Sequence, residues 1–193
     1  MSNAPIQPAN TPNWIGKGTH GTSSFRAKAI QASKFIPTTG RAGLGVYFWK
    51  KTAFAERFAK DWHRDRLSEG LYGGEADQLC AVILADIVTN TDQYFDLEDP
   101  AFKEKLMTLI VEREAKGTKM DTAACVKLRT ALLRRFEDHL GCKATVLQVA
   151  LPPPKASGSW YLINPLGAPL CYLVIDPDCI KIETVLFTEA GSN

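Results

Sequence analysis

The sequence predicts an α+β fold, in which a β-core packs against flanking helices. Short β-prone runs recur along the chain, and between them lie longer stretches with apolar residues at three- and four-residue spacing. The 193 residues are 45% hydrophobic and 23% charged, which is ordinary for one globular domain. We therefore predict a single domain over residues 14–193, behind a flexible N-terminal tail of residues 1–13.

The N-terminal half of the chain is predicted to hold the tail, an extended piece, a strand and two helices. Three prolines among polar residues mark 1–13 as the tail. Ser23 and Ser24 are suitable caps for the first helix, and Thr52 for the second. The expected elements are an extended piece at 17–22, a helix at 25–34, a Gly- and Thr-rich loop at 38–45, a strand at 46–49 and a helix at 53–67.

The C-terminal half combines β-prone runs with two long helices. Gly117 interrupts the helical pattern, and Gly141 ends it in the manner of a glycine after a helix C-terminus. Pro152–Pro154 make the following loop stiff and exposed. The expected elements are a loop at 70–77, a central strand at 78–88, helices at 102–116 and 122–140, a strand at 144–151, a loop at 152–158 and final strands at 170–175 and 179–187.

Charge and cysteine usage narrow the function classes. The net charge of +2 does not argue by itself for a nucleic-acid binder, although the basic runs Lys50-Lys51 and Arg134-Arg135 can still guide RNA or DNA. The five cysteines include no pair with C-x-x-C spacing, and three histidines leave little for a zinc site. No apolar stretch approaches the ~18 to 20 residues of a membrane span, so we expect a cytoplasmic protein without membrane contacts. An export route that needs no cleaved signal stays open.

Three short motifs carry the chemistry that the sequence suggests. They are Thr19-His20-Gly21-Thr22, Gly43-Leu44-Gly45-Val46-Tyr47-Phe48 and, on the next expected helix, Ala55-Glu56-Arg57-Phe58-Ala59. A nicotinamide ring needs an aromatic surface to stack on. Its carboxamide needs a backbone N–H and C=O side by side, which glycine exposes because it has no side chain. The ribose hydroxyls need a donor or acceptor such as His or Thr. Together the motifs indicate a nicotinamide dinucleotide pocket.

These motifs resemble those of the diphtheria-toxin and poly(ADP-ribose) polymerase branch of ADP-ribosyltransferases. That branch has His-Gly-Ser/Thr on its first strand, then Gly-x-Gly-Ile/Val-Tyr-Phe, then a helix with a small residue and an aromatic. Tyr47 matches the motif tyrosine, and Phe58 the second aromatic eleven residues later. Ala55 stands where the polymerases place a serine, so one polar contact is absent. The resemblance covers about residues 17–62 well and 168–187 loosely, and it implies a split β-core with a helical insertion at about 96–142.

The resemblance implies NAD as the substrate, and it implies a role for each motif residue. His20 would hold a ribose, Gly21 would bind the carboxamide, and Tyr47 and Phe58 would sandwich the nicotinamide. The residues expected to bind NAD are His20, Gly21, Thr22, Gly45, Tyr47, Phe48 and Phe58. Structural alternatives stand beside these roles. Phe58 shares a stripe with Phe54 and Trp62 that is also typical of a core-facing helix side, and Gly45 also fits a simple turn.

The carboxylate that the family uses for catalysis is missing from its expected place. In the segment Cys171-Tyr172-Leu173-Val174-Ile175-Asp176, the family's Glu or Gln falls on Cys171. An acid near the 2′-hydroxyl stabilises the cation that develops when the glycosidic bond breaks. Glu183 and Glu75 are candidate replacements, and the sequence does not choose between them. Cys171 is itself a candidate catalytic residue or a small buried one. Glu183 also fits an outward, solvated place on its strand.

The function expected from this resemblance is mono-ADP-ribosylation of a protein or nucleic acid by a bacterial or phage toxin or defence effector, which would have an antitoxin partner. Two alternatives stay open. The domain is a catalytically inactive NAD-binding or interaction module, or it is an NAD glycohydrolase. The other two histidines, His63 and His139, are expected on the surface, because both stand among charged residues on helices.

Overall fold

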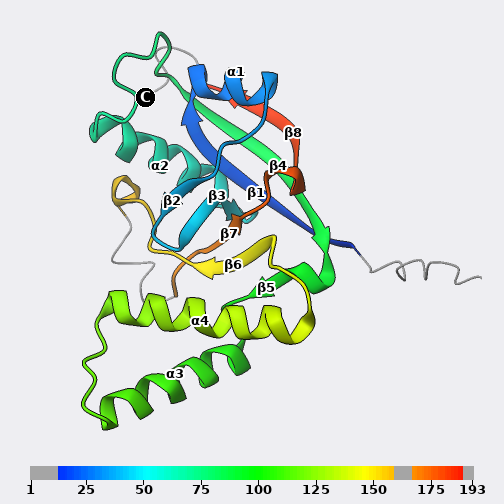
Figure 1. Cartoon of the computed structure of the whole chain (residues 1–193). Coiled ribbons are helices and arrows are strands. Elements are labelled where there is room, and N and C mark those ends of the chain that lie inside the picture. The colour runs from blue at the N-terminus through cyan, green and yellow to red at the C-terminus, as the bar shows by residue number, and fades with distance from the viewer. Residues whose placement is uncertain (1–12, 159–166, 189–193) are drawn as a thin grey trace, which may run out of the picture.

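The structure, a computed structural model, describes residues 13–158 and 167–188 (Figure 1). They form an eight-stranded, mostly antiparallel sheet with helices on both faces, which confirms the predicted α+β class. The strands are β1 (Asn13–Ser23), β2 (Thr38–Gly40), β3 (Gly43–Lys50), β4 (Cys80–Asn90), β5 (Tyr94–Asp96), β6 (Val146–Ala150), β7 (Leu170–Val174) and β8 (Ile180–Phe187). The helices are α1 (Ser24–Ala32), α2 (Ala55–Ser68), α3 (Pro100–Ala115) and α4 (Thr122–Leu140), with short 3₁₀ helices η1 (Thr91–Gln93), η2 (Lys155–Ser157) and η4 (Pro177–Cys179).

The main path of the sheet runs β5-β6-β7-β3-β1-β4-β8, and β2 pairs only with β3. β1 pairs with β4 along all eleven of its residues. Its pairing with β3 covers only Gly18 opposite Lys50 and Thr19 opposite Trp49. The two strands therefore diverge after Thr19, and from His20 onward the β3-side edge of β1 pairs with no strand of the described ranges. This divergence divides the sheet into two halves that meet where the centre of β1 pairs with the C-terminal end of β3.

Each face of the sheet carries its own hydrophobic core, because successive side chains of a strand point to opposite faces. Phe48 belongs to the core beneath α1, which also contains Phe35. The neighbouring Trp49 belongs to the core beneath α2, α3 and α4, which also contains Phe58 and Cys171. In Figure 1, α1 lies above the sheet, while the α3–α4 pair lies at the opposite end, next to β6.

Several expected helix ends are confirmed. Ser23 caps α1, and its side chain accepts a hydrogen bond from the backbone N–H of Arg26 at 3.2 Å. α4 ends at Leu140, and Gly141 follows it with a φ of 69°, a left-handed conformation that glycine adopts without a steric penalty. The expected insertion at 96–142 is helical, as α3 and α4, although its first residue still belongs to β5.

Other expectations were wrong in detail. The loop expected at 38–45 contains β2 and the start of β3, which form a hairpin. Thr52 does not cap α2, which begins at Ala55 after Phe54 without a side-chain cap. Phe54 is 61% exposed and therefore does not share the packed face of Phe58. Of the expected tail, Asn13 is the first residue of β1, and residues 1–12 lie outside the described ranges.

The short strand β5 was missed because three residues give no readable alternation. β5 runs parallel to β6, with Tyr94 opposite Val146. The described part of the chain contains no helix with the length and apolar character that crossing a membrane requires.

Candidate functional site

His20 lies on β1 at the first position beyond its pairing with β3. Its Nδ1 lies 2.9 Å from the backbone oxygen of Tyr47 on β3, so the ring bridges the two diverging strands. A carbonyl only accepts hydrogen bonds, so Nδ1 must carry the hydrogen, and Nε2 keeps a lone pair that can accept one. The ring contacts Phe35 edge-on, with centroids 5.3 Å apart, and lies 5.6 Å from the ring of Phe48.

The rings of His20 and Tyr47 lie on opposite faces of the sheet. His20 contacts Phe35 and Phe48 of the core beneath α1. Tyr47 packs against the core beneath α2. We expected the two rings to line one pocket, but they face different sides of the sheet. The direct contact between the two residues joins Nδ1 of His20 to the backbone oxygen of Tyr47. A ligand that uses both residues must therefore pass through the place where β1 and β3 diverge.

Gly21 presents its backbone polar groups to this diverging edge. The N–H of Lys51 on the β3 side donates to the carbonyl of Lys17 at 2.8 Å, and Ser24 donates to Leu79 on the β4 side at 2.7 Å. Backbone groups alternate between the two edges of a strand, so those of odd-numbered β1 residues point toward β3. The N–H and C=O of Gly21 therefore point toward β3 beyond the last β1–β3 pair. An amide ligand needs such a donor and acceptor side by side.

The side-chain position of Gly21 is taken by α2. A Cβ atom placed on Gly21 would lie 1.8 Å from the backbone oxygen of Ala59. Thr19, on the same face of β1, donates its hydroxyl to the carbonyl of Ala55 at 2.8 Å. The glycine of the first motif thus has a packing role, because it lets α2 lie directly on β1.

Tyr47 uses its hydroxyl within its own hairpin. The hydroxyl donates to the carbonyl of Gly43 at 2.7 Å and accepts from the N–H of Ala42 at 3.0 Å. Partial burial raises the pKa of this hydroxyl, so it stays protonated at neutral pH. The turn between β2 and β3 is therefore fastened to the Tyr47 ring, and only the ring surface remains for a ligand.

The other residues expected to bind NAD are largely enclosed. Phe58 is 8% exposed, and its ring lies 5.3 Å from that of Trp49. Phe48 is fully buried in the core beneath α1. Gly45 lies against β7, because a Cβ on it would meet the Leu173 side chain at 2.4 Å. Thr22 is buried, with 4% of its surface exposed. These four residues have structural roles here, and His20, Gly21 and Tyr47 meet at the strand divergence.

Neither Cys171 nor Glu183 provides an available carboxylate or thiolate at this place. Cys171 is 1% exposed, and burial raises the pKa of its thiol far above the ordinary value. A buried, protonated thiol is not a nucleophile. Glu183 lies on β8, where its exposed carboxylate pairs with Lys17 at 3.0 Å. It therefore has the solvated, outward place that its strand pattern allowed. Within the described ranges, no three His, Cys, Asp or Glu side chains gather closely enough to hold a metal ion.

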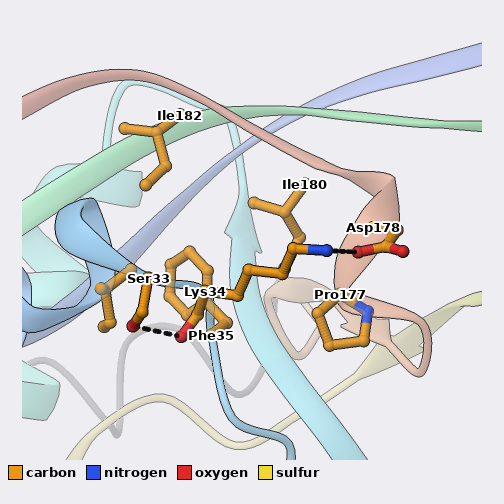
Figure 2. Close-up of a pocket in the computed structure, with 8 residues that line it drawn as sticks. Ser33, Lys34, Phe35, Pro177, Asp178, Ile180 and Ile182 are labelled. Carbon is orange, nitrogen blue, oxygen red and sulfur yellow. Dashed lines mark hydrogen bonds and ion pairs between the residues drawn. The ribbon is translucent and has the colours of Figure 1, made fainter.

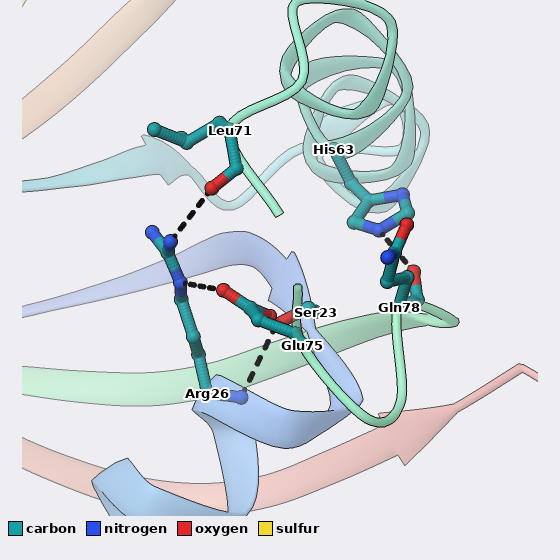
Figure 3. A network of polar contacts seen from close by, with 6 residues as sticks. All are labelled: Ser23, Arg26, His63, Leu71, Glu75 and Gln78. Atoms are coloured by element: carbon teal, nitrogen blue, oxygen red, sulfur yellow. Dashed lines mark hydrogen bonds and ion pairs between the residues drawn. The ribbon is translucent and has the colours of Figure 1, made fainter. Parts of the chain in front are cut away.

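Glu75 is the centre of a polar network that joins the loop after α2 to the start of α1 (Figure 3). It accepts a hydrogen bond from the Ser23 hydroxyl and forms an ion pair with Arg26 at 2.6 Å. Arg26 also donates to the carbonyl of Leu71 at 2.9 Å. Only 11% of the Glu75 side chain is exposed. Its partner Ser23 lies two residues after Gly21 on β1, so the Glu75 carboxylate is near the proposed site. Arg26 already neutralises this carboxylate.

The expectation that His63 lies on the surface was wrong, whereas His139 is exposed as expected. His63 is 5% exposed, its ring stacks on Tyr72 at 5.0 Å between centroids, and its Nε2 lies 2.9 Å from the carbonyl of Gln78. The charged neighbours of His63 in the sequence suggested an exposed position. In the structure Arg64 is exposed, whereas His63 points toward the loop after α2. His63 and Tyr72 had no sequence signal that marked them as partners.

A cavity of about 270 Å³ lies next to His20 on the α1 face (Figure 2). Phe35 connects the cavity with His20, because its ring lines the cavity and also contacts the His20 ring. The ammonium group of Lys34 pairs with Asp178 at 2.6 Å across the cavity. The lining residues are Ile30, Ser33, Lys34, Phe35, Pro177, Asp178, Ile180 and Ile182. The cavity combines apolar lining residues with one ion pair, Lys34–Asp178.

Comparison of the chain with protein-family models and with curated proteins finds no match.

We predict that the protein loses stability as the pH falls below about 6.5. Burial lowers the pKa of both His20 and His63, and the carbonyl hydrogen bond of each opposes this in part. Both histidines therefore bind protons more readily in the unfolded chain. The stability they contribute is complete above the unfolded pKa and declines between that value and the lowered folded pKa. The expected slope is up to about 1.4 kcal/mol per pH unit for each histidine. Urea unfolding from pH 5 to pH 8 measures it, and His63→Gln should flatten the slope.

Cys171 is expected to resist alkylation in the folded protein. Its thiol is buried and protonated, so iodoacetamide at neutral pH should modify it roughly 100-fold more slowly than in urea. Cys125, which is partly exposed on α4, is the internal control. Peptide mass spectrometry after timed quenching measures both rates. Equal alkylation rates for Cys171 and Cys125 in the folded protein would show that Cys171 is accessible and reactive. Cys171 would then again be a candidate catalytic residue.

Proposed function

We propose that this protein is an NAD-dependent ADP-ribosyltransferase that transfers a single ADP-ribose unit to a macromolecule. The observation that carries the proposal is the arrangement at the strand divergence. The divergence is bordered by the His20 imidazole with an acceptor at Nε2, by the Gly21 backbone pair that faces β3, and by the Tyr47 ring on the other face of the sheet. All three come from the motifs that resemble those of ADP-ribosyltransferases. These three groups match the three parts of a nicotinamide riboside that need recognition.

In this proposal, the N–H and C=O of Gly21 bind the nicotinamide carboxamide. The Tyr47 ring offers the stacking surface, and Nε2 of His20 accepts a hydrogen bond from a ribose hydroxyl. The rest of the dinucleotide lies toward the cavity beside Phe35. The Lys34 ammonium group lines this cavity, and its ion pair with Asp178 must open before it can bind the pyrophosphate. Phe35 contacts the His20 ring and also lines the cavity, so the cavity and the His20 ring lie on the same face of the sheet.

The proposed reaction breaks the bond between C1′ of the ribose and the nicotinamide nitrogen. The electron pair of that bond leaves with nicotinamide, and a nucleophilic oxygen or nitrogen of the acceptor forms the new bond to C1′. The proton of the acceptor passes to solvent. The positively charged nicotinamide is already a good leaving group, so the protein must chiefly orient C1′ toward the acceptor and exclude water. A carboxylate would stabilise the developing cation further.

A second candidate function is an NAD-binding module without catalysis. The buried Cys171 supports it, because this thiol occupies the place that an acid takes in the family that the motifs resemble. A third candidate is an NAD glycohydrolase, in which water replaces the macromolecular acceptor. The three candidates predict different products from the same starting material.

Incubation of the full chain with NAD labelled in the adenylate part tests the proposal. Release of nicotinamide together with label on an added protein or nucleic acid supports transfer. Free ADP-ribose in the absence of any acceptor indicates the glycohydrolase. Binding by calorimetry without nicotinamide release indicates the module. Absence of both binding and release would contradict all three functions and overturn the assignment of NAD to this site.

A further inference from the structure

A second, larger cavity lies on the α2 side of the molecule. It has a volume of about 460 Å³, which is within the range of small-ligand sites. Three segments distant in sequence form it: the β2–β3 turn, the C-terminal half of α2, and the loop that follows β6. The lining residues are Arg41, Trp62, Asp65, Arg66, Glu69, Pro152, Pro153, Pro154, Lys155 and Gly158.

The walls of this cavity are fixed in place. The carboxylate of Asp65 accepts hydrogen bonds from the backbone N–H groups of Lys155 and Ala156, at 2.6 and 2.9 Å. Arg57 donates to the carbonyl of Ser157 at 3.1 Å. These bonds fasten the proline-rich loop to α2. The cavity is therefore a formed feature of the fold, and its acid Asp65 is already occupied by backbone donors.

The cations of the cavity exceed its available acids. Glu69 is paired with Arg66 at 2.5 Å, and Asp65 binds the loop backbone. Arg41 on one wall and Lys155 on another are exposed and form no ion pair with any described residue. Two cations that line the cavity from separate segments, without acids of their own, favour a ligand with negative charge at two points.

Arg66 and Trp62 also line this cavity and contact each other. The guanidinium carbon of Arg66 lies over the Trp62 ring, 4.1 Å from its centroid. Nε of Arg66 is buried and has no hydrogen-bond partner among the described residues. An arginine held on an aromatic ring is a platform on which a nucleic-acid base stacks. The platform and the two cations together match a base with its flanking phosphates.

The cavity is also close to the proposed nicotinamide site. Arg41 precedes Ala42, whose N–H is bound by the Tyr47 hydroxyl. Trp62 lies one turn beyond Phe58 on α2, and Trp62 and Tyr47 both pack against the core that contains Phe58. A group held in the cavity therefore lies on the Tyr47 side of the strand divergence, where an acceptor must approach C1′.

We propose that this cavity binds single-stranded nucleic acid and that this strand is the acceptor of ADP-ribose. One base stacks on Arg66 over Trp62, and the adjacent phosphates bind Arg41 and Lys155. A base nitrogen or a sugar oxygen of the bound strand displaces nicotinamide at C1′ and loses its proton to solvent. The acceptor role rests on the proposed transferase function, whereas binding of the strand does not require NAD.

Fluorescence anisotropy with labelled single strands of about 12 nucleotides, as DNA and as RNA, tests the inference without NAD. The double variant Arg41→Ala/Lys155→Ala should bind at least 10-fold more weakly. It should also lower the slope of log K against log salt by about 1.4, because two phosphate contacts are lost. Lys105→Ala/Lys181→Ala removes two exposed cations on α3 and β8, away from the cavity, and should retain wild-type binding. Circular dichroism confirms that each variant is folded.

Each outcome of this experiment decides the inference. Weaker binding in the cavity variant alone supports it, and a difference between DNA and RNA then identifies the strand. Equal weakening by the control variant indicates binding by general charge and overturns it. Equal binding of a polyglutamate peptide of the same charge indicates an acidic protein partner and also overturns it. A wild-type protein that releases nicotinamide but binds no strand overturns this inference and leaves the proposed function standing.

Discussion

Replacing Gly21 with alanine is expected to lower the stability of the protein by about 3 kcal/mol, at the upper end of typical overpacking costs. The new Cβ would lie 1.8 Å from the backbone oxygen of Ala59, and a backbone atom of a helix cannot turn aside as a flexible side chain can. α2 must therefore move off β1, and the bond from Thr19 to Ala55 should break with it. For a domain of this size, the melting temperature should fall by roughly 6 to 12 °C. Urea and thermal unfolding measure both quantities.

Gly117→Ala is the matched control for this substitution. Gly117 lies between α3 and α4 with a φ of 80°, and a Cβ there meets nothing within 4 Å. Only the left-handed backbone conformation is then penalised, and the expected cost is about 1 kcal/mol. A Gly21→Ala protein as stable as the Gly117→Ala protein would mean that α2 yields easily, and it would remove the packing role that we assign to Gly21.

The packing of Gly21 against α2 explains why the sequence predicted the surroundings of this residue only in part. The motif around Gly21 correctly indicated a position that needs glycine, and the expected reason was a ligand close to the backbone. The structure adds α2 as a second reason, which no local pattern reveals because Ala59 lies 38 residues further along the chain. The long helices α3 and α4 were predictable because their periodicity and their glycine ends are local signals.

Side-chain contacts between segments distant in the chain could not be predicted from local sequence patterns. Phe58 and Tyr47 are eleven residues apart, which predicts a sandwich only if both rings face an open pocket. Instead, Phe58 packs on Trp49, and Tyr47 binds its own hairpin turn. Glu75 stands in a glycine-rich loop without any regular pattern. Its pairing with Arg26, from a helix that precedes it by 49 residues, follows from how the loop folds back.

His20→Ala is expected to reduce nicotinamide release by about 100-fold, which corresponds to the loss of one well-placed hydrogen bond in a desolvated site. The substitution removes both functions of the ring, namely the bridge from Nδ1 to the Tyr47 carbonyl and the acceptor at Nε2. His139→Ala is the control, because His139 is exposed on α4 and should retain full release. Initial rates of nicotinamide release, measured by chromatography, give the comparison.

Two further substitutions separate a structural role of His20 from a ligand-binding one. Asparagine places an N–H near the position of Nδ1 and can restore the bridge to Tyr47, but it has no acceptor near Nε2. Glutamine reaches the Nε2 position and leaves the bridge open. If Nε2 binds the ribose, His20→Gln should retain more release than His20→Asn, while His20→Asn should be the more stable in urea. The reverse order of activities would show that the imidazole acts only by joining β1 to β3. The divergence of these strands would then be a structural feature without a ribose bound to it.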